Sequence, residues 1–143
     1  MSRSIEDLEP ETRALCTEFL QQCLHAKYPM VLVCTHRSFE EQEALYAKGR
    51  VRPGAVVTHA RAGYSWHNFR RAFDVCFLIG TALHWDGPWN IPGKIGRDLG
   101  LIWGGDWNIT VQDRPHFENS AGTTLAELRA KTMIPVINLR YDA

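Results

Sequence analysis

The sequence has no excess of charge of either sign, because 16 lysine and arginine residues balance 16 aspartate and glutamate residues over 143 positions. A protein that binds nucleic acid usually carries an excess of basic residues, so no nucleic-acid partner is expected. Long apolar runs are also missing: the longest uncharged run, residues 75–85, has 11 residues, whereas about 20 are needed to cross a bilayer. The first residues are polar and acidic and show no secretory signal. We therefore expect synthesis in the cytoplasm and no stable membrane insertion.

Several common site motifs are absent as well. None of the four cysteines forms a Cys-x-x-Cys pair, which excludes a thiolate zinc knuckle. Cys16 and Cys23 lie seven residues apart on an expected helix, about 10 Å along its axis, which is too far for a disulfide. There is no His-Glu-x-x-His, no Gly-x-Ser-x-Gly and no phosphate-binding glycine loop. The usual helical zinc site, the usual serine hydrolase and a nucleotide site are thereby excluded.

What the sequence does contain is enough apolar material for one compact domain over residues 1–143. Hydrophobic residues make up 45% of the chain and aromatic residues 10%, which suits a single core at this length. Hydrophobic spacing and capping residues predict helices at about residues 10–24, 39–48, 92–99 and after 124. Short strands are predicted at residues 30–34, 55–58, 72–78, 101–103 and 116–117. Helices flanking a small antiparallel sheet indicate an α+β fold.

The central predicted strand, residues 72–78, contains an unexpected charge. Phe73, Val75 and Phe77 share one face of it, so Asp74 falls on the other. A carboxylate inside so apolar a strand is costly unless it is paired or bound to a metal. Asp74 is therefore a candidate ligand.

Two further segments supply partners for Asp74. Six histidines are present, at positions 25, 36, 59, 67, 84 and 116. His67 lies in the loop that leads into the strand of Asp74, and His116 follows Asp113 and a proline in a later turn. Zinc enzymes usually hold the ion with three nitrogen or oxygen ligands and leave a fourth position for water. His67, Asp74 and His116 can form such a set, with Asp113 placed over the open position as a base.

The same residues carry a family resemblance. Ser65-x-His67-(x)6-Asp74, followed by Asp113-x-Pro-His116, resembles the zinc peptidases of the D-Ala-D-Ala metallopeptidase group. The sequence is most similar to phage endolysins that act as L-alanyl-D-glutamate peptidases, which are relatives of the VanY carboxypeptidases. Two further stretches resemble that family: Thr35-His36-Arg37-Ser38 with Gln42, Leu45, Tyr46 and Gly49-Arg50, and the tryptophan-glycine stretch at residues 101–107. The resemblance spans about residues 10–120.

The resemblance implies a hedgehog-like peptidase fold and a role for each matching residue. His67, Asp74 and His116 would hold one Zn²⁺ per chain, and Asp113 would be the catalytic carboxylate. Arg37 would stabilise the negative charge that develops on the substrate carbonyl, and Ser65 and His36 would lie on the substrate side. The sequence departs from the family at Arg70, where the family usually has glycine. If that position has φ > 0, arginine costs about 1 kcal/mol there.

The expected activity is zinc-dependent hydrolysis of the L-Ala–D-Glu bond of peptidoglycan. Seven basic residues lie between His36 and Asp74, against four acidic residues including Asp74, and this local positive field favours an acidic substrate. A D,D- or L,D-carboxypeptidase with the same site remains an alternative, as does a non-catalytic zinc-bearing binding module. The resemblance further implies a monomeric phage lysin without a separate wall-binding domain. It would be made in the host cytoplasm and would reach the cell wall after the membrane opens.

Overall fold

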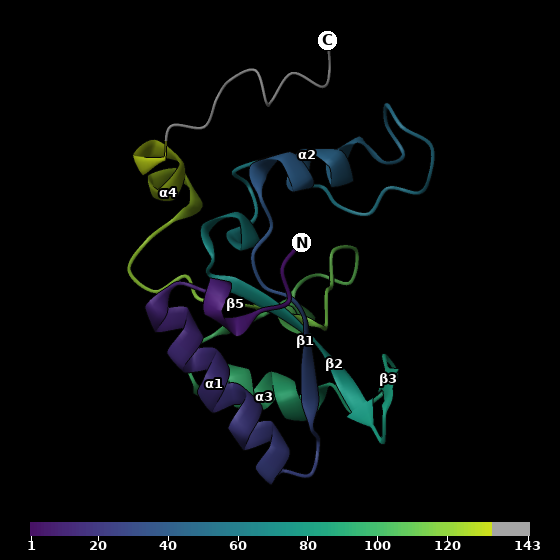
Figure 1. Ribbon diagram of the computed structural model, residues 1–143, viewed down its shortest axis with the longest axis vertical. Helices are drawn as coiled ribbons and strands as arrows, with labels where there is room; N and C mark the ends of the chain where they lie inside the picture. The colour runs from purple at the N-terminus through teal and green to yellow at the C-terminus, as the bar shows by residue number, and fades with distance from the viewer. Residues whose placement is uncertain (133–143) are drawn as a thin grey trace.

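The computed structural model describes residues 1–132, which form two helices packed on one side of a small antiparallel sheet (Figure 1). The helices are α1 (Pro10–His25), α2 (Phe39–Ala47), α3 (Asn90–Asp98) and α4 (Leu125–Lys131). The strands are β1 (Met30–Cys34), β2 (Ala72–Ile79), β3 (Ala82–His84), β4 (Ile102–Trp103) and β5 (His116–Glu118). Short 3-10 turns lie at Ile5–Asp7, Trp66–Phe69 and Gly104–Asp106. The predicted α+β class is confirmed, while residues 133–143 of the expected domain lie outside the described part.

The sheet has the order β1-β2-β5-β4, and β3 pairs with the end of β2. All pairings are antiparallel. Cys34 of β1 and His116 of β5 both lie opposite Asp74 of β2, one on each neighbouring strand. Since side chains of directly paired residues lie on the same face of a sheet, this register brings three polar side chains together at the centre of the sheet.

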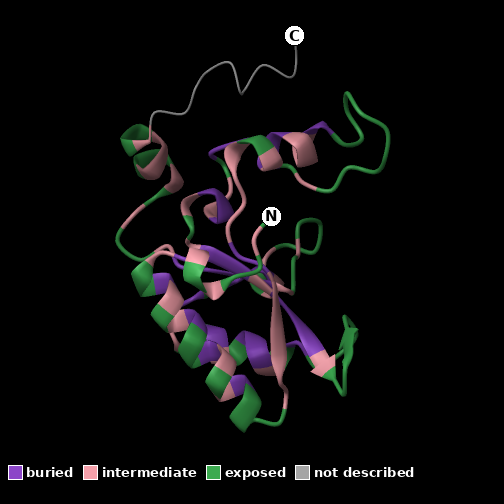
Figure 2. Ribbon diagram, in the orientation of Figure 1, coloured by how far each residue is buried: buried purple, intermediate pink, exposed green. Residues whose placement is uncertain are grey.

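The hydrophobic core lies between the other face of β2 and the helices α1 and α3. Phe73, Val75 and Phe77 are buried there, as their alternation predicted. The Phe19 ring of α1 lies with its centroid 5.4 Å from that of Phe73 and 4.6 Å from that of Phe117. Figure 2 shows buried residues concentrated along β2 and the facing sides of α1 and α3. Burial of each large side chain contributes about 1.5–3 kcal/mol, so this contact holds the helices onto the sheet.

Helix α2 begins where the sequence predicted. The Ser38 hydroxyl accepts a hydrogen bond from the Glu41 amide, and the Glu41 carboxylate accepts one from the Ser38 amide. This reciprocal pair satisfies two amides that the first turn would otherwise leave without partners. In Figure 1, α2 and α4 lie at the opposite end of the molecule from α1 and α3.

Three sequence predictions of local structure are wrong. Residues 55–58 form no strand, and this loop runs along the surface without a sheet partner. Leu24 is 62% exposed instead of facing the core, because in the last turn of α1 it is the preceding residue, Cys23, that faces the sheet. Helix α3 begins at Asn90, two residues before Pro92.

Candidate metal centre and active site

Asp74, His67 and His116 meet on the sheet face opposite the core. Asp74 comes from the middle of β2, and His116 opens β5 directly across from it. His67 lies in the 3-10 turn Trp66–Phe69. The Ser65 hydroxyl caps this turn by accepting a hydrogen bond of 3.3 Å from the backbone amide of His67. Both histidines are buried. The structure thus brings together the three residues that the sequence predicted as metal ligands.

Both histidines approach the same oxygen of Asp74. The Nε2 atom of His67 and the Nδ1 atom of His116 each lie 3.1 Å from the same carboxylate oxygen, Oδ1 of Asp74. Asp74 is shared by two groups of candidate ligands whose atoms lie within 4.8 Å of one another, Cys34/His67/Asp74 and Asp74/Asp113/His116. The donor set of His67, Asp74 and His116 is the one that zinc prefers when it keeps a position open for water.

The second nitrogen of each ring is held by an acceptor behind the site. His67 Nδ1 lies 2.8 Å from the carbonyl oxygen of Thr35, and His116 Nε2 lies 2.7 Å from Glu118 Oε1. An acceptor at one ring nitrogen fixes the proton there and leaves the lone pair of the other nitrogen pointing into the centre. Metal-binding histidines are usually oriented in this way. The residues present therefore fit a zinc ion, with His67, Asp74 and His116 as the ligands that would hold it.

Without a cation, protons would neutralise this cluster. Burial lowers the pKa of His67, but the charge and hydrogen bond of Asp74 outweigh it and raise that pKa to about 10. Burial likewise opposes the charged form of His116, while hydrogen bonds to Asp74 and Glu118 raise its pKa to about 9. Burial raises the pKa of Asp74, but the two histidines outweigh this effect and hold it well below its usual range. A metal ion that binds here takes the place of these protons.

Asp113 lies beside the ligand cluster, on the turn that leads into β5. Its carboxylate, the Asp74 carboxylate and a nitrogen of His116 all lie within 4.8 Å of one another. The turn is closed by a hydrogen bond of 3.2 Å from the His116 amide to the Asp113 carbonyl. Although the residue is exposed, desolvation of its carboxyl group and the nearby charge of Asp74 raise the pKa of Asp113. This combination favours a carboxylate that can accept a proton.

Arg37 approaches the centre from the chain between β1 and α2. Its backbone amide donates to the carbonyl of His67 at 3.2 Å. Its side chain donates to Gln42 Oε1 at 3.0 Å and lies 3.7 Å from the sulfur of Cys34. Arg37 is thereby held next to the ligands by an uncharged partner. Its positive charge stays available to a substrate.

The two other predicted substrate residues have structural contacts of their own. The Ser65 hydroxyl is used as the cap of the turn that carries His67. His36 is partly buried, and its carbonyl accepts a hydrogen bond of 2.9 Å from the Ser2 amide. Burial and the nearby charge of Arg70 lower the pKa of His36, so it tends toward the neutral form. The substrate roles of Ser65 and His36 stay predictions.

Sequence reasoning missed Glu118 and Cys34 as neighbours of the site. Glu118 follows His116 by two residues on β5, and residues two apart on a strand share a face, so this spacing was a usable signal. Cys34 Sγ lies 3.7 Å from His67 Nδ1, and its ligand atom groups with those of His67 and Asp74 within 4.8 Å. No local pattern signals Cys34, because its position depends on an irregularity in the β1–β2 pairing between Leu32 and Cys34.

Three solved structures share this fold. The L-Ala D-Glu endopeptidase ChiX of Serratia marcescens aligns with a TM-score of 0.56 and 21% identity, over 89% of this chain and 90% of that chain. The LD-carboxypeptidase LdcB aligns with a TM-score of 0.59 and 20% identity, over 87% of this chain and 71% of the other. DacB from Streptococcus pneumoniae D39 aligns with a TM-score of 0.55 and 21% identity, over 92% of this chain and 76% of that chain. At this identity the likeness shows a shared fold.

The fold and the histidine–aspartate centre define the chain as a metallopeptidase. Two family profiles match it, both described as D-alanyl-D-alanine carboxypeptidase: VanY over residues 5–82 and a second peptidase profile over residues 58–119. The peptidoglycan L-alanyl-D-glutamate endopeptidase CwlK of Bacillus subtilis is 32% identical, over 78% of this chain and 73% of its own length. The chain belongs to the VanY family of peptidases.

Proposed function

We propose that this chain is a zinc-dependent peptidoglycan endopeptidase that cleaves the bond between L-Ala and D-Glu of the stem peptide. The observation that carries the proposal is the approach of His67 Nε2 and His116 Nδ1 to the same oxygen of Asp74, with Asp113 beside it. Similarity to CwlK and ChiX, whose names describe this bond, supports the choice of substrate.

The residues of the site divide the reaction among them. When bound, zinc would supply Lewis acidity and lower the pKa of a water molecule. Asp113 takes the proton of the attacking water and passes it to the leaving amine of D-Glu. Arg37 stabilises the negative charge that develops on the carbonyl oxygen of L-Ala. Thr35 and Glu118 hold the two histidine rings in place throughout.

Mass spectrometry of purified peptidoglycan after digestion tests the proposal. We expect stem peptides that begin with a free D-Glu amino group, with L-Ala left on the sugar chain. The zinc-loaded Asp113→Asn variant serves as the control for contaminating activity. Release of terminal D-Ala alone would instead establish a carboxypeptidase, the activity that the family description names.

We further propose that the enzyme is a phage lysin that reaches the wall only after the membrane has been opened. In residues 1–132, no helix is long and apolar enough to cross a membrane. Expression in a bacterial host, with and without a pore-forming agent, tests this proposal. Lysis that occurs equally fast without the agent would contradict it.

A further inference from the structure

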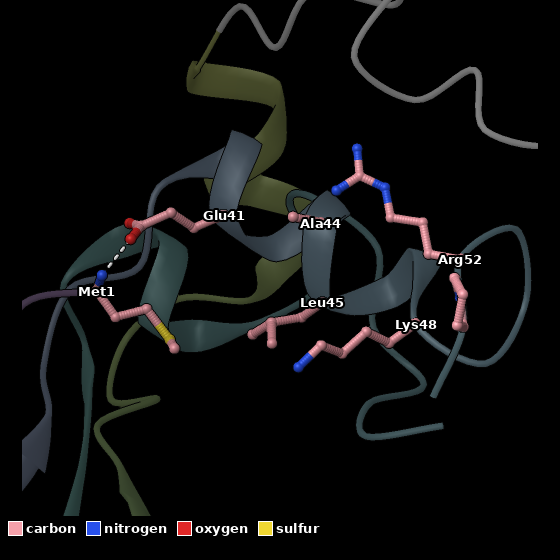
Figure 3. Close-up of a pocket in the computed structure, with 7 residues that line it drawn as sticks. Met1, Glu41, Ala44, Leu45, Lys48 and Arg52 are labelled. Carbon is pink, nitrogen blue, oxygen red and sulfur yellow. Dashed lines mark hydrogen bonds and ion pairs between the residues drawn. The ribbon is translucent and has the colours of Figure 1, made fainter. Parts of the chain in front are cut away.

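Helix α2 presents a second face that is only partly buried. Gln42, Glu43 and Ala47 form its buried side. A different stripe faces a cavity of about 460 Å³. Figure 3 shows this cavity, which is lined by Met1, Glu41, Ala44, Leu45, Lys48, Arg52 and Pro53. Three of them, Glu41, Ala44 and Leu45, lie on α2 at the spacing i, i+3 and i+4, which normally marks a face packed on a core, and Lys48 caps the end of the helix.

The lining combines apolar walls with positive charge. Ala44, Leu45 and Pro53 give the cavity an aliphatic surface. The side chains of Lys48 and Arg52 extend back alongside the helix from its C-terminal end and the following loop (Figure 3). Within residues 1–132, neither side chain has a hydrogen-bond or ion-pair partner. Their charges are therefore available to an anion.

The acidic residue in the lining does not cancel these charges. The Glu41 carboxylate pairs with the amino group of Met1 and also accepts a hydrogen bond of 2.9 Å from the Ser38 amide. Its negative charge is thus engaged at the N-terminal end of α2. Lys48 lies two helical turns away from it, so the far end of the cavity keeps a positive field.

Met1 lies between the cavity and Arg37 of the proposed active site. Met1 lines the cavity, and its sulfur lies 3.0 Å from Nε of Arg37. Arg37 in turn lies 3.7 Å from the sulfur of Cys34, which pairs across the strands with the ligand Asp74. A peptide that places its scissile carbonyl near Arg37 would thus lead a neighbouring residue toward α2.

We propose that this cavity is a substrate subsite for an aliphatic residue that ends in a carboxylate, with Lys48 and Arg52 as its anion-binding groups. The inference rests on the proposed function, because the stem peptide around the L-Ala–D-Glu bond carries such carboxylates. The aliphatic lining accommodates the methylene groups, and the two cations bind the charged end. The cavity would then select for acidic stem peptides over neutral ones.

Two soluble stem peptides, one with free carboxylates and one with the same groups amidated, test this subsite. The zinc-loaded Lys48→Ala/Arg52→Ala double variant should show a KM about tenfold higher for the acidic peptide, because exposed ion pairs are individually weak but two act together here. Its kcat should stay within about twofold of the parent, and its KM for the amidated peptide should not change. The increase should shrink at high salt, since exposed charges are screened over about 10 Å at 0.1 M.

The matched control is Lys94→Ala, which removes one positive charge from α3. Lys94 pairs with Asp98 there, and α3 lies at the opposite end of the molecule from α2 (Figure 1). This variant should bind and cleave both peptides as the parent does. The conservative Lys48→Arg variant should keep the parental KM, because it keeps the charge.

Calorimetric binding of both peptides separates failure of the subsite from failure of the proposed function. If the parent binds the acidic peptide better than the amidated one but cleaves neither, the proposed function fails and the subsite stands. If the double variant loses affinity equally for both peptides, the subsite is wrong. The subsite is also wrong if the double variant binds both peptides as tightly as the parent does. Failure of the parent to bind either peptide also overturns it.

Discussion

Asp113 owes its position to a close contact between two backbone segments. Its amide donates to the carbonyl of Gly104 at 3.0 Å. A Cβ atom added at Gly104 would lie 2.2 Å from the carbonyl oxygen of Asp113. Only glycine permits this approach, so the tryptophan-glycine stretch before β5 sets where the proposed base stands.

The exchange Asp113→Asn tests the role of this carboxylate directly. Loss of a positioned general base typically lowers the rate by about 10²–10⁴, while zinc content and fold should be unchanged. Peptidoglycan hydrolysis and zinc content are measured on the same preparations. Asp106→Asn is the matched control, since Asp106 is an acidic residue nearby that pairs with Arg97 at 3.3 Å. Hydrolysis by Asp113→Asn at the parental rate would show that the assigned mechanism is wrong.

Glu118 should govern how tightly the metal is held. The exchange Glu118→Gln removes the carboxylate charge behind His116 but keeps the side-chain size. Loss of such an outer partner typically weakens metal affinity about 10–100-fold, and we expect a decrease in this range. Competition with a chromophoric chelator measures it, and Glu127→Gln on the exposed helix α4 provides the control. Unchanged zinc affinity would mean that Glu118 does not orient the ring.

At the scale of the elements, the packing of helix α1 determines the reactivity of its two thiols. Cys16 and Cys23 are fully buried against the sheet. Burial raises the pKa of each thiol to about 12. Because the thiolate is the reactive species, only about 1 in 10⁴ of these thiols would be reactive at pH 8.

Alkylation of the folded protein at increasing pH checks this packing. We expect mass spectrometry to show Cys16 and Cys23 unmodified by iodoacetamide near neutral pH. The thiolate fraction rises as the pH approaches 12, so modification should appear only in strong alkali or after unfolding. A denatured sample is the positive control. Rapid modification at pH 8 in the native state would contradict the described packing of α1.

Arg70 ends the turn that carries His67, and it does so with φ of +62°. The position at which the family usually has glycine thus has a left-handed backbone in this chain. Its side chain donates to the carbonyl of Asp7 at 2.9 Å. Arginine is more strained than glycine in this backbone conformation, but its side chain makes a contact with the N-terminal segment that glycine cannot make.

Two variants separate these contributions at position 70. Arg70→Ala and Arg70→Gly both lose the contact with Asp7, but only glycine relieves the left-handed strain. We therefore expect Arg70→Gly to be about 1 kcal/mol more stable than Arg70→Ala. Urea unfolding of the zinc-loaded variants measures the difference. Equal stability of the two would show that the strain is not stored at this position.

At the scale of the whole molecule, short-range patterns predicted the elements well. The Ser38–Glu41 capping box located α2, and alternation along β2 identified both its core face and Asp74. The predicted ligands His67, Asp74 and His116 come from two motifs that each span few residues. These features depend on residues that are close together in the sequence, so local patterns are enough to predict them.

Features that depend on long-range pairing were not predicted. The placement of Cys34 opposite Asp74 follows from the irregular β1–β2 register, which no local pattern reveals. Residues 55–58 have the composition of a strand but no partner to pair with, and strand propensity is realised only in a sheet. The cavity beside α2 likewise depends on the path of the loop after that helix.

Zinc should bind with a stoichiometry of one per chain and stabilise the whole domain. A ligand that binds only the folded state adds about 2.7 kcal/mol at a concentration 100-fold above its Kd, so Tm should rise by several degrees. Elemental analysis and thermal unfolding, with and without a chelator, measure both effects. His67→Ala should lose the metal and the stabilisation, whereas His59→Ala, an exposed histidine outside the site, should keep both. Full zinc retention by His67→Ala would show that His67 is not a zinc ligand.

The cross-strand position of Asp74 has a consequence for the order of folding. Its partners Cys34 and His116 come from strands far apart in the chain, and both must pair with β2 before the ligand atoms meet. Loops that large close slowly, since their entropy is lost before the contacts form. The ligand set therefore exists only in chains whose sheet has already assembled. A metal ion would therefore bind only after the sheet has formed, and it would not nucleate the folding of the chain.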